Sequence, residues 1–207
     1  MILGVTPARG GSKGVPRKNV RPIHGRPLIA WTVEAAKASR LIDRYIVSTE
    51  DPEIAAVARS LDVEVFDRPR ELADDLTTTV DVLRHMLTHV EANTVVLLQA
   101  TSPIRSAGLI DHCIERFFET GADSLATGFM CKFVPYGKNT RRRQDLEGFF
   151  YDDGNVYVIR ADILRAGDRY GTHLEHVLLE REQNVEIDDE FDFWLAEEVL
   201  KRRHGPI

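Results

Sequence analysis

Cysteine is scarce in this 207-residue sequence, which has only Cys113 and Cys131 and no Cys-x-x-Cys pair. We therefore expect neither a disulfide framework nor a structural zinc site. Long apolar runs are also missing, since no run approaches the roughly 20 residues that cross a bilayer. The first residues lack a basic segment followed by a long apolar one, so no secretory signal is expected. These absences predict a cytoplasmic protein without a membrane span.

An excess of positive charge is the third feature that the sequence lacks. Its 27 Lys and Arg residues face 33 Asp and Glu residues, and the formal net charge is -6. This balance argues against a nucleic-acid-binding protein. The cations gather instead at 9–26 and 138–143, which predicts local anion sites. The scattered histidines offer no close metal pair, and we place His85 and His89 on the surface or half-buried on a helix.

The composition that remains, with 43% hydrophobic and 29% charged residues, is typical of a globular protein. The length fits one α/β domain, 1–207. Strand-like and helix-like patterns alternate along it, which predicts a doubly wound, mostly parallel sheet. The expected strands are 2–6, 45–48, 63–66, 94–99, 123–127 and 155–160, and the expected helices are 28–38, 51–61, 80–90 and 107–120.

Helix ends and the last third of the chain complete this outline. Pro27 and Pro52 suit first helical turns, and Thr78 lies in a threonine run that could cap the next helix. The segment 128–150 contains many Lys, Arg, Gly and Pro residues, so we expect a loop or an excursion from the domain there. A final helix from about 190 to 203 is expected to bury one side, with Phe191, Trp194, Leu195, Val199 and Leu200 on it.

A stretch rich in glycine and cations follows the first strand, at residues 8–19 (ARGGSKGVPRKN). Its glycines let the backbone bend closely around a ligand, and its four cations supply positive charge. The spacing matches neither G-x-x-x-x-G-K-[ST] nor G-x-G-x-x-G. A loop between strand and helix in an α/β protein is where phosphates dock, so we predict a polyphosphate site. The alternative is an ordinary solvated basic loop.

Two carboxylates, Glu186 and Asp188, alternate along a segment that we predict to be a strand. Both side chains would then face the same way, with Ile187 packing inward. Such a pair suits Mg²⁺, which keeps several waters and is completed by substrate phosphates. Equally, the acids could only charge the first turn of the helix near Glu190. A basic glycine loop with a two-acid metal site suggests nucleoside triphosphate chemistry at phosphorus, which needs no protein nucleophile.

Further motifs occur in order over nearly the whole chain, at 8–19, 27–32 (PLIAWT), 46–49 (IVST), 71–73 (ELA), 98–105 (LQATSPIR), 142–146 (RRQDL), 186–188 (EID) and 191–193 (FDF). Together they resemble the acylneuraminate cytidylyltransferases, the CMP-sialic acid synthetases. This resemblance implies a Rossmann-like nucleotidyltransferase fold and a homodimer, with 128–150 as the dimerisation excursion. It also implies a Mg²⁺-dependent reaction in which the anomeric hydroxyl of an α-keto acid sugar attacks the α-phosphorus of CTP and releases pyrophosphate.

The same resemblance implies roles for individual residues. Arg9, Lys18 and Asp188 would be catalytic, with Asp188 and Glu186 holding the metal ion. Gln99 would orient the sugar, and the arginine of the Arg143–Gln144 pair would take its carboxylate. Asn155 and Tyr157 would lie on the strand that walls the sugar pocket. The nucleotide ligands would be Arg9, Gly11, Ser12, Lys13, Lys18, Asn19 (to cytosine), Arg68 and Thr78.

Two departures from the family pattern leave alternatives open. Glu186 stands where the family usually has Asp, and the segment between 127 and 141 is shorter than usual. The acceptor is therefore open among sialic acid, a bacterial relative, 3-deoxy-octulosonate or a smaller acid. A different nucleotide, or a catalytically silent protein that binds CTP without turnover, are further alternatives.

Overall fold

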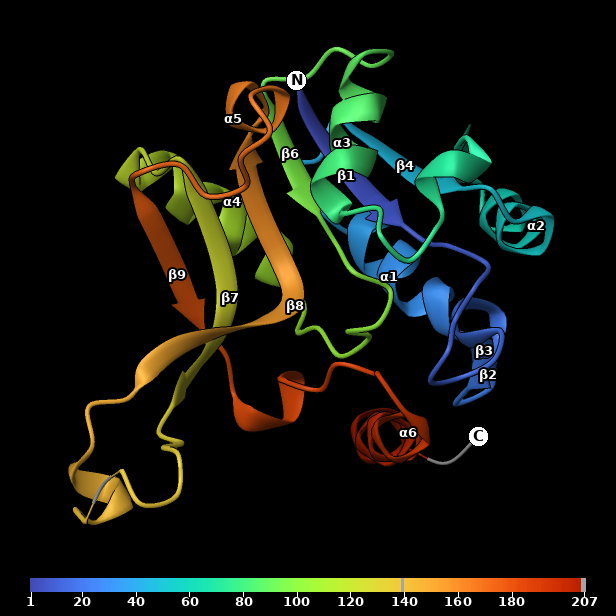
Figure 1. Ribbon diagram of the computed structural model, residues 1–207. Coiled ribbons are helices and arrows are strands. Elements are labelled where there is room, and N and C mark those ends of the chain that lie inside the picture. Colours follow the sequence, from blue (N-terminus) through green and yellow to red (C-terminus); the bar gives the residue numbers. More distant parts are fainter. Residues whose placement is uncertain (139, 206–207) are drawn as a thin grey trace.

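The computed structural model describes residues 1–138 and 140–205, and seven strands within these ranges form one sheet (Figure 1). β8 is antiparallel to both of its neighbours, and every other neighbouring pair is parallel. The predicted α/β class with a mostly parallel sheet is confirmed. In spatial order the strands are β5 (Glu64–Asp67), β4 (Arg44–Thr49), β1 (Ile2–Pro7), β6 (Thr94–Leu97), β8 (Phe149–Arg160), β7 (Ser124–Cys131) and β9 (Leu174–Leu178).

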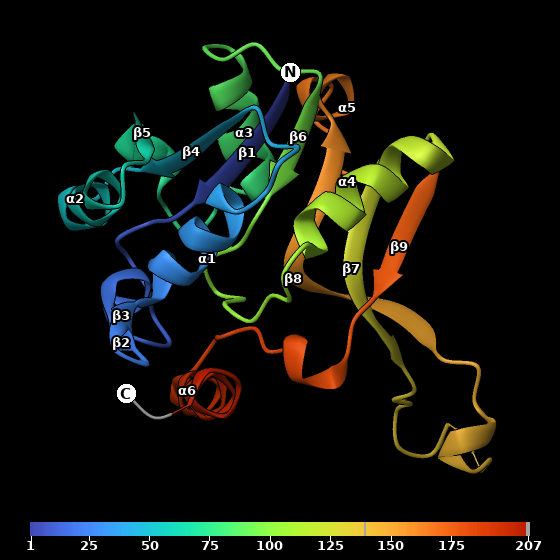
Figure 2. The same cartoon turned by 180° about the vertical axis from the view of Figure 1, so that it is seen from behind.

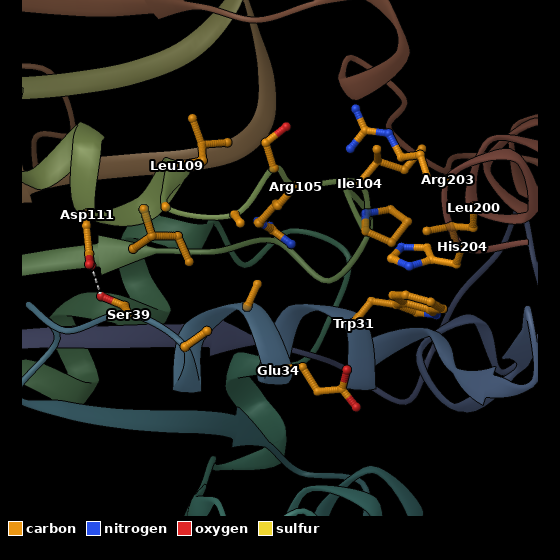
Figure 3. Close-up of a pocket in the computed structure, with 17 residues that line it drawn as sticks. Trp31, Glu34, Ser39, Ile104, Arg105, Leu109, Asp111, Leu200, Arg203 and His204 are labelled. Carbon is orange, nitrogen blue, oxygen red and sulfur yellow. Dashed lines mark hydrogen bonds between the residues drawn. The ribbon is translucent and has the colours of Figure 1, made fainter.

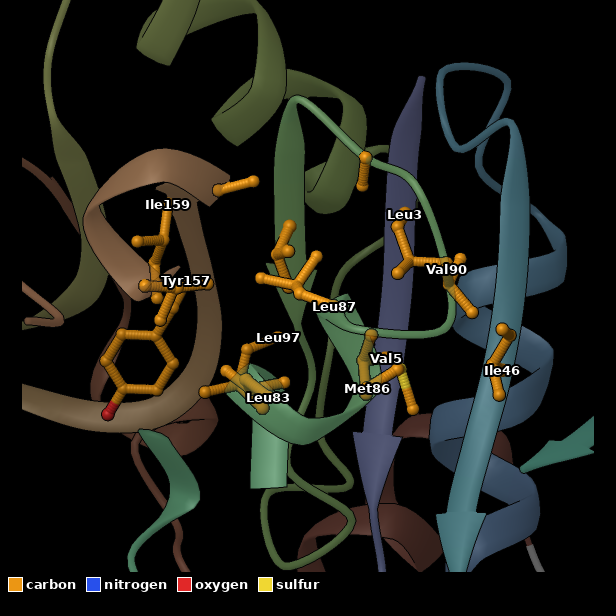
Figure 4. Packing of buried hydrophobic residues seen from close by; sticks show 14 residues of the cluster. Leu3, Val5, Ile46, Leu83, Met86, Leu87, Val90, Leu97, Tyr157 and Ile159 are labelled. Carbon is orange, nitrogen blue, oxygen red and sulfur yellow. The ribbon is translucent and has the colours of Figure 1, made fainter. Parts of the chain in front are cut away.

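Helices cover both faces of the sheet, as the doubly wound prediction requires. α1 (Leu28–Lys37), α2 (Pro52–Ser60) and α4 (Leu109–Thr120) pack on one face (Figure 2). α3 (Thr79–Leu87) and α5 (Ala161–Arg165) pack on the other. There, Leu83 and Met86 of α3 meet Leu3 and Val5 of β1 (Figure 4). The burial of these apolar side chains is the main force that holds the layers together.

Two predicted helix starts form as the sequence indicates, and the first has a cap that was not predicted. The Asp51 carboxylate accepts from two backbone amides at the start of α2, with Pro52 at its first position. Thr78 and Asp81 form a reciprocal capping box on α3. Pro27 differs, because it pairs with Pro22 in a short hairpin, β2 (Pro22–Ile23) and β3 (Arg26–Pro27), and precedes α1 instead of entering its first turn.

The predicted strand through Glu186 and Asp188 is wrong. The chain at 184–187 has no regular secondary structure and belongs to neither sheet; the Ile187 amide donates instead to the Thr101 carbonyl, at 2.8 Å. Ile187 is nonetheless fully buried and Glu186 half-buried, so the expected alternation survives. A local pattern of alternating polarity describes an extended chain and leaves open whether a partner strand lies beside it.

The excursion at 128–150 is more regular than predicted. β7 and β8 continue past the sheet as a two-stranded extension, paired from Gly128 with Asp152 to Cys131 with Phe149, and this extension projects from the body (Figure 1). Within the excursion, the described residues 132–138 and 140–148 lack strand structure, and the second of these ranges carries the short 3₁₀ helix η3 (Arg143–Asp145). Residue 139 of the predicted excursion lies outside the described residues.

α6 (Glu190–His204) crosses below the carboxyl end of the sheet (Figure 1). It buries Phe193, Ala196 and Leu200, whereas Phe191 and Trp194 are 65% and 53% exposed. The prediction that these two aromatics face the core is wrong, because the buried stripe begins at Phe193 and runs along a different side. Three further 3₁₀ helices are η1 (Lys18–Val20), η2 (Arg70–Leu72) and η4 (Arg181–Gln183). No helix in the described ranges is long and apolar enough to cross a membrane.

Candidate active site

A cavity of about 320 Å³ opens where β1 and β6 end. It gathers segments that are far apart in the sequence: the glycine loop, the residues after β5 and β6, and the segment before α6. We call it the cleft. Of the predicted site residues, those that line it are Arg9, Gly11, Ser12, Lys18, Asn19, Arg68, Gln99, Glu186 and Asp188.

Two glycines let the loop approach its neighbours. A Cβ on Gly10 would lie 2.3 Å from an oxygen of the Asp51 carboxylate, and a Cβ on Gly14 would lie 1.9 Å from the Asp188 carbonyl oxygen. Neither position has space for a side chain, so any substitution would displace the loop. Asn19 is buried, and its Nδ2 donates to the Arg9 carbonyl at 3.0 Å. This bond fixes the turn that carries Arg9.

Glu50 is a residue of the site that sequence reasoning missed. Its carboxylate accepts from the Gly10 amide at 2.7 Å and from Arg68 at 2.6 Å. The available signal was its place directly after β4, because open α/β sheets put ligand sites at the carboxyl ends of their strands.

Asp75 pairs with two cations of the glycine loop, Arg9 and Lys13. One of its oxygens lies 2.8 Å from Arg9 Nη1, and the other lies 2.5 Å from Lys13 Nζ. Lys13 and then Arg9 hold the pKa of Asp75 below its usual value. Lys13 is therefore held beside the cleft through Asp75, although it does not appear among the described residues that line it.

The two carboxylates near the end of the chain share the cleft with Lys18. Burial, and next the charge of Asp188, raise the pKa of Glu186. Burial lowers the pKa of Lys18 against the opposing effect of both acids, and its Nζ donates to the Ile187 carbonyl. Like charges this close repel, and a divalent cation would relieve that repulsion. The donor set fits Mg²⁺, which needs only one or two carboxylates when a phosphate completes its shell.

Other predicted residues lie elsewhere in the described part of the chain. Asn155 is fully buried, and its amide donates to the Ile104 and Gln183 carbonyls. Thr78 is the cap of α3. Arg143 stacks on the Phe133 ring, 4.7 Å from its centroid, in the excursion, where Gln144 is its exposed neighbour.

Tyr157 also lies outside the cleft. Its hydroxyl donates to Asp152 at 2.6 Å, and its ring lines a different cavity, with Arg169.

A further cavity, of about 270 Å³, lies between α1, the segment 103–111 and the end of α6, and Trp31 and His204 stack at its rim (Figure 3). It contains none of the predicted site residues. Arg105 also lines this cavity and is half-buried. The loss of hydration around its guanidinium lowers its pKa to about 10, and it donates to the carbonyls of Gln99 and Asn155. Arg105 therefore ties the end of β6 to β8 and positions Gln99.

Comparison with known proteins identifies the family. A model of the family described as Cytidylyltransferase matches residues 3–182, and the chain belongs to that family. It is 30% identical to N-acylneuraminate cytidylyltransferase A of Danio rerio, over 94% of this chain and 50% of that protein. It is 31% identical to CMP-N,N'-diacetyllegionaminic acid synthase of Legionella pneumophila, over 97% of this chain and 96% of that protein.

The chain thus spans about half the length of the zebrafish relative and nearly all of the Legionella one. Among solved structures, CMP:2-keto-3-deoxy-manno-octonic acid synthetase complexed with CTP is similar with a TM-score of 0.78 and 15% identity, over 98% of this chain and 99% of that one. At this identity the likeness shows a shared fold. The family resemblance expected from the motifs is confirmed.

Proposed function

We propose that this protein transfers CMP from CTP to the anomeric hydroxyl of an acidic α-keto sugar of the sialic acid class and releases pyrophosphate. The observation that carries the proposal is the cleft itself, where Arg9, Asn19, Gln99 and Asp188 line one cavity. The names of the relatives, which include a sialic acid and a legionaminic acid enzyme, support an acidic sugar as the acceptor.

The glycine loop would hold the nucleotide. Arg9 and Lys18 would neutralise the triphosphate and its charge in the transition state, with Lys13 joining once Asp75 releases it. Ser12 and the backbone at Gly11 would add hydrogen-bond donors. Further nucleotide contacts are proposed for Asn19 to the cytosine, Arg68 after β5, and Thr78 at the start of α3.

Glu186 and Asp188 would hold Mg²⁺ in the cleft, near Lys18. The ion, when bound, neutralises phosphate charge and makes the α-phosphorus a better electrophile. The residues then have mainly to align the sugar hydroxyl with the leaving pyrophosphate. Gln99, fixed by Arg105 at the end of β6, would orient the sugar.

A homodimer would give the predicted residues outside the cleft a place in the sugar site. The excursion exposes apolar side chains, with Phe133 67% and Tyr136 fully accessible, and such a patch on a projecting hairpin suits an isologous contact. In that assembly Arg143 and Gln144 would contact the sugar. Asn155 and Tyr157 would lie on β8, the strand that walls the sugar pocket. Light scattering at micromolar concentration should give the mass of two chains, and the mass of one chain would contradict this assembly.

A pyrophosphate-release assay tests the activity. Purified protein is mixed with Mg²⁺, one of CTP, UTP, GTP or ATP, and a panel of acid sugars that includes sialic acid, a legionaminic acid and 3-deoxy-octulosonate. We expect release only with CTP, and only with some of the acids. CTP binding, seen as a thermal shift, without turnover on any acceptor would favour the catalytically silent alternative and overturn the proposal.

A further inference from the structure

The segment that carries both carboxylates of the cleft has no strand or helix of its own to hold it. Residues 184–187 lie outside both sheets, and α6 begins only at Glu190. A carboxylate that turns freely has to be ordered when a cation binds, and this ordering costs affinity. Contacts with other elements therefore have to set the direction in which Asp188 leaves the backbone.

The peptide group between Ile187 and Asp188 is held at both of its polar atoms. Its carbonyl accepts from Lys18 Nζ, and its amide, that of Asp188, donates to Asp192 Oδ2 at 3.0 Å. The amide before it, that of Ile187, donates to the Thr101 carbonyl at 2.8 Å. Since a peptide group is planar, two bonds on opposite sides of it fix its orientation.

The next peptide group, between Asp188 and Asp189, is also held on both sides. Its amide donates to the same Asp192 Oδ2, at 3.2 Å. Its carbonyl packs against Gly14, where an added Cβ would lie 1.9 Å from the oxygen. The two peptide planes beside the Asp188 Cα are thus both fixed, and together they set φ and ψ of Asp188 and the direction of its side chain.

Asp192 makes two of these contacts from the first turn of α6. It belongs to a reciprocal capping box, in which the Asp189 carboxylate accepts from the amides of Phe191 and Asp192. The usual partner in such a box returns one bond, to the amide of the N-cap residue. Asp192 accepts in addition from the amide of Asp188, so its carboxylate holds a residue that lies outside the helix.

The contacts of Asp192 are those of a support for Asp188, and they differ from those of a further metal ligand. Its Oδ2 is occupied by two backbone amides, which are good partners for a charged acceptor. Asp192 does not appear among the described residues that line the cleft. Within 1–138 and 140–205, no group of three or more His, Cys, Asp or Glu side chains is placed to hold a metal ion.

We propose that Asp192 is a positioning residue, which holds the Asp188 carboxylate in the direction that lets it bind a divalent cation in the cleft. This inference rests on the proposed function and deepens it, because it assigns the contact that makes one of the two metal-binding acids rigid. Residues that orient a metal ligand typically change metal affinity by about 10- to 100-fold when they are lost.

The test measures the dissociation constant of Mn²⁺, which prefers the same oxygen ligands as Mg²⁺, from the electron paramagnetic resonance signal of the free ion. For Asp192→Ala we expect this constant to rise by about 10-fold or more. Asp192→Asn keeps an oxygen that can accept from both amides, and its constant should stay within about 3-fold of wild type. Asp188→Asn identifies the site, since it should weaken Mn²⁺ binding at least as much as Asp192→Ala.

Asp189→Ala is the matched control. It removes the same charge from the same helix start and breaks the same capping box, but the Asp188 amide keeps its acceptor. Both alanine variants should lower the melting temperature by about 2–4 °C, whereas only Asp192→Ala should lose Mn²⁺ affinity. If Asp192→Ala does not fold, Asp192→Ser replaces it, because the serine oxygen stands one atom nearer the backbone and cannot reach both amides.

Equal Mn²⁺ dissociation constants for Asp192→Ala and Asp189→Ala would make Asp192 a helix cap only and would overturn the inference. A loss of affinity in Asp192→Asn as large as that in Asp192→Ala would make the charge itself the ligand, with the same consequence. Absence of Mn²⁺ binding by the wild-type protein also overturns it.

The inference and the proposed function can fail separately. A wild-type protein that shows the expected Mn²⁺ pattern with its variants but releases no pyrophosphate with any acid sugar rejects only the proposed function. A wild-type protein that turns over an acid sugar, with Asp192 variants whose Mn²⁺ affinity is unchanged, rejects only the positioning role of Asp192.

Discussion

The carboxylate of Glu50 joins the guanidinium of Arg68, at 2.6 Å, and its second oxygen accepts from the amide of Gly10, at 2.7 Å. The Arg68 side chain is only 4% exposed. One acid therefore ties the glycine loop after β1 to the cation after β5, and this contact sets the width of the cleft between them.

Removing Glu50 should destabilise the fold strongly. In Glu50→Ala the Arg68 charge stays buried without a partner, which costs about 3–5 kcal/mol in the free energy of unfolding. Glu50→Gln, which keeps the shape and can still accept one hydrogen bond, should lose less. Urea denaturation measures both. Asp67→Asn is the control. The Asp67 carboxylate lies 3.6 Å from Arg59 in an exposed ion pair, so its loss should lower the free energy of unfolding by less than about 1 kcal/mol. Equal losses for Glu50→Ala and the control would refute the expectation.

Asp75→Asn should tighten CTP binding. The wild-type carboxylate occupies Arg9 and Lys13, so a triphosphate has to displace it, and the exposed pairs are worth about 0.2–1 kcal/mol each. We expect the dissociation constant for CTP, measured by calorimetry, to fall by roughly 2- to 5-fold. Glu91→Gln makes the same change in charge near the amino end of β6, beside Asn93, and should leave the constant unchanged. Weaker binding by Asp75→Asn would mean that Asp75 positions the cations instead.

Asp188→Asn should change the magnesium requirement of turnover. Loss of a charged oxygen ligand weakens a hard-cation site, so we expect the Mg²⁺ concentration for half-maximal rate to rise by about 10-fold or more, with the fold intact. Glu186→Asp keeps a carboxylate and should stay active. Glu190→Gln is the control for the alternative in which these acids only stabilise the first turn of α6 through its helix dipole. If Asp188→Asn and Glu190→Gln both lower the melting temperature and leave the Mg²⁺ dependence alone, that alternative holds.

Asp123 should make stability depend on pH in the acid range. Its carboxylate accepts from the amides of Thr172 and His173 and lies 2.9 Å from Arg160, and chiefly the two amides lower its pKa to about 2. A depressed pKa contributes stability above the ordinary carboxyl range, near 4, and this contribution is lost as the pH falls toward 2. Asp123→Asn should therefore melt at a lower temperature than wild type at pH 7, and the gap should shrink between pH 4 and pH 2. A gap that is constant with pH would contradict this account.

Most of the fold could be predicted from the alternation of short apolar runs with amphipathic stretches, because each pattern indicates which faces of one element are buried. The antiparallel direction of β8 and the existence of β9 did not follow. Strand direction depends on which neighbour the chain returns to, and β9 reads Leu-Glu-His-Val-Leu, with an ion-paired Glu175 on the α4 side, so its polarity hides it.

For the site, residue types and motif order were enough to predict most of the residues discussed here that line the cleft. Arg9, Lys18 and Asn19 lie on one loop, and a loop rich in glycine must approach something closely wherever it is placed. Asn155 shows the limit of this reasoning. Its amide is fully used by the carbonyls of Ile104 and Gln183, and no local pattern distinguishes an amide that holds a loop from one that meets a ligand.

By itself, the sequence determined the class of fold, the loop that carries the cations, the place of Pro52 at the start of α2, the cap of α3, and the family. These features depend on residues close together in the chain or on the order of motifs. Only the tertiary structure decided that Glu50 holds Arg68, that Asp75 occupies Arg9 and Lys13, and that Arg169 lies over the Tyr157 ring beside Asp152. Each of those relationships joins residues on different elements, and the packing of the elements fixes their distance.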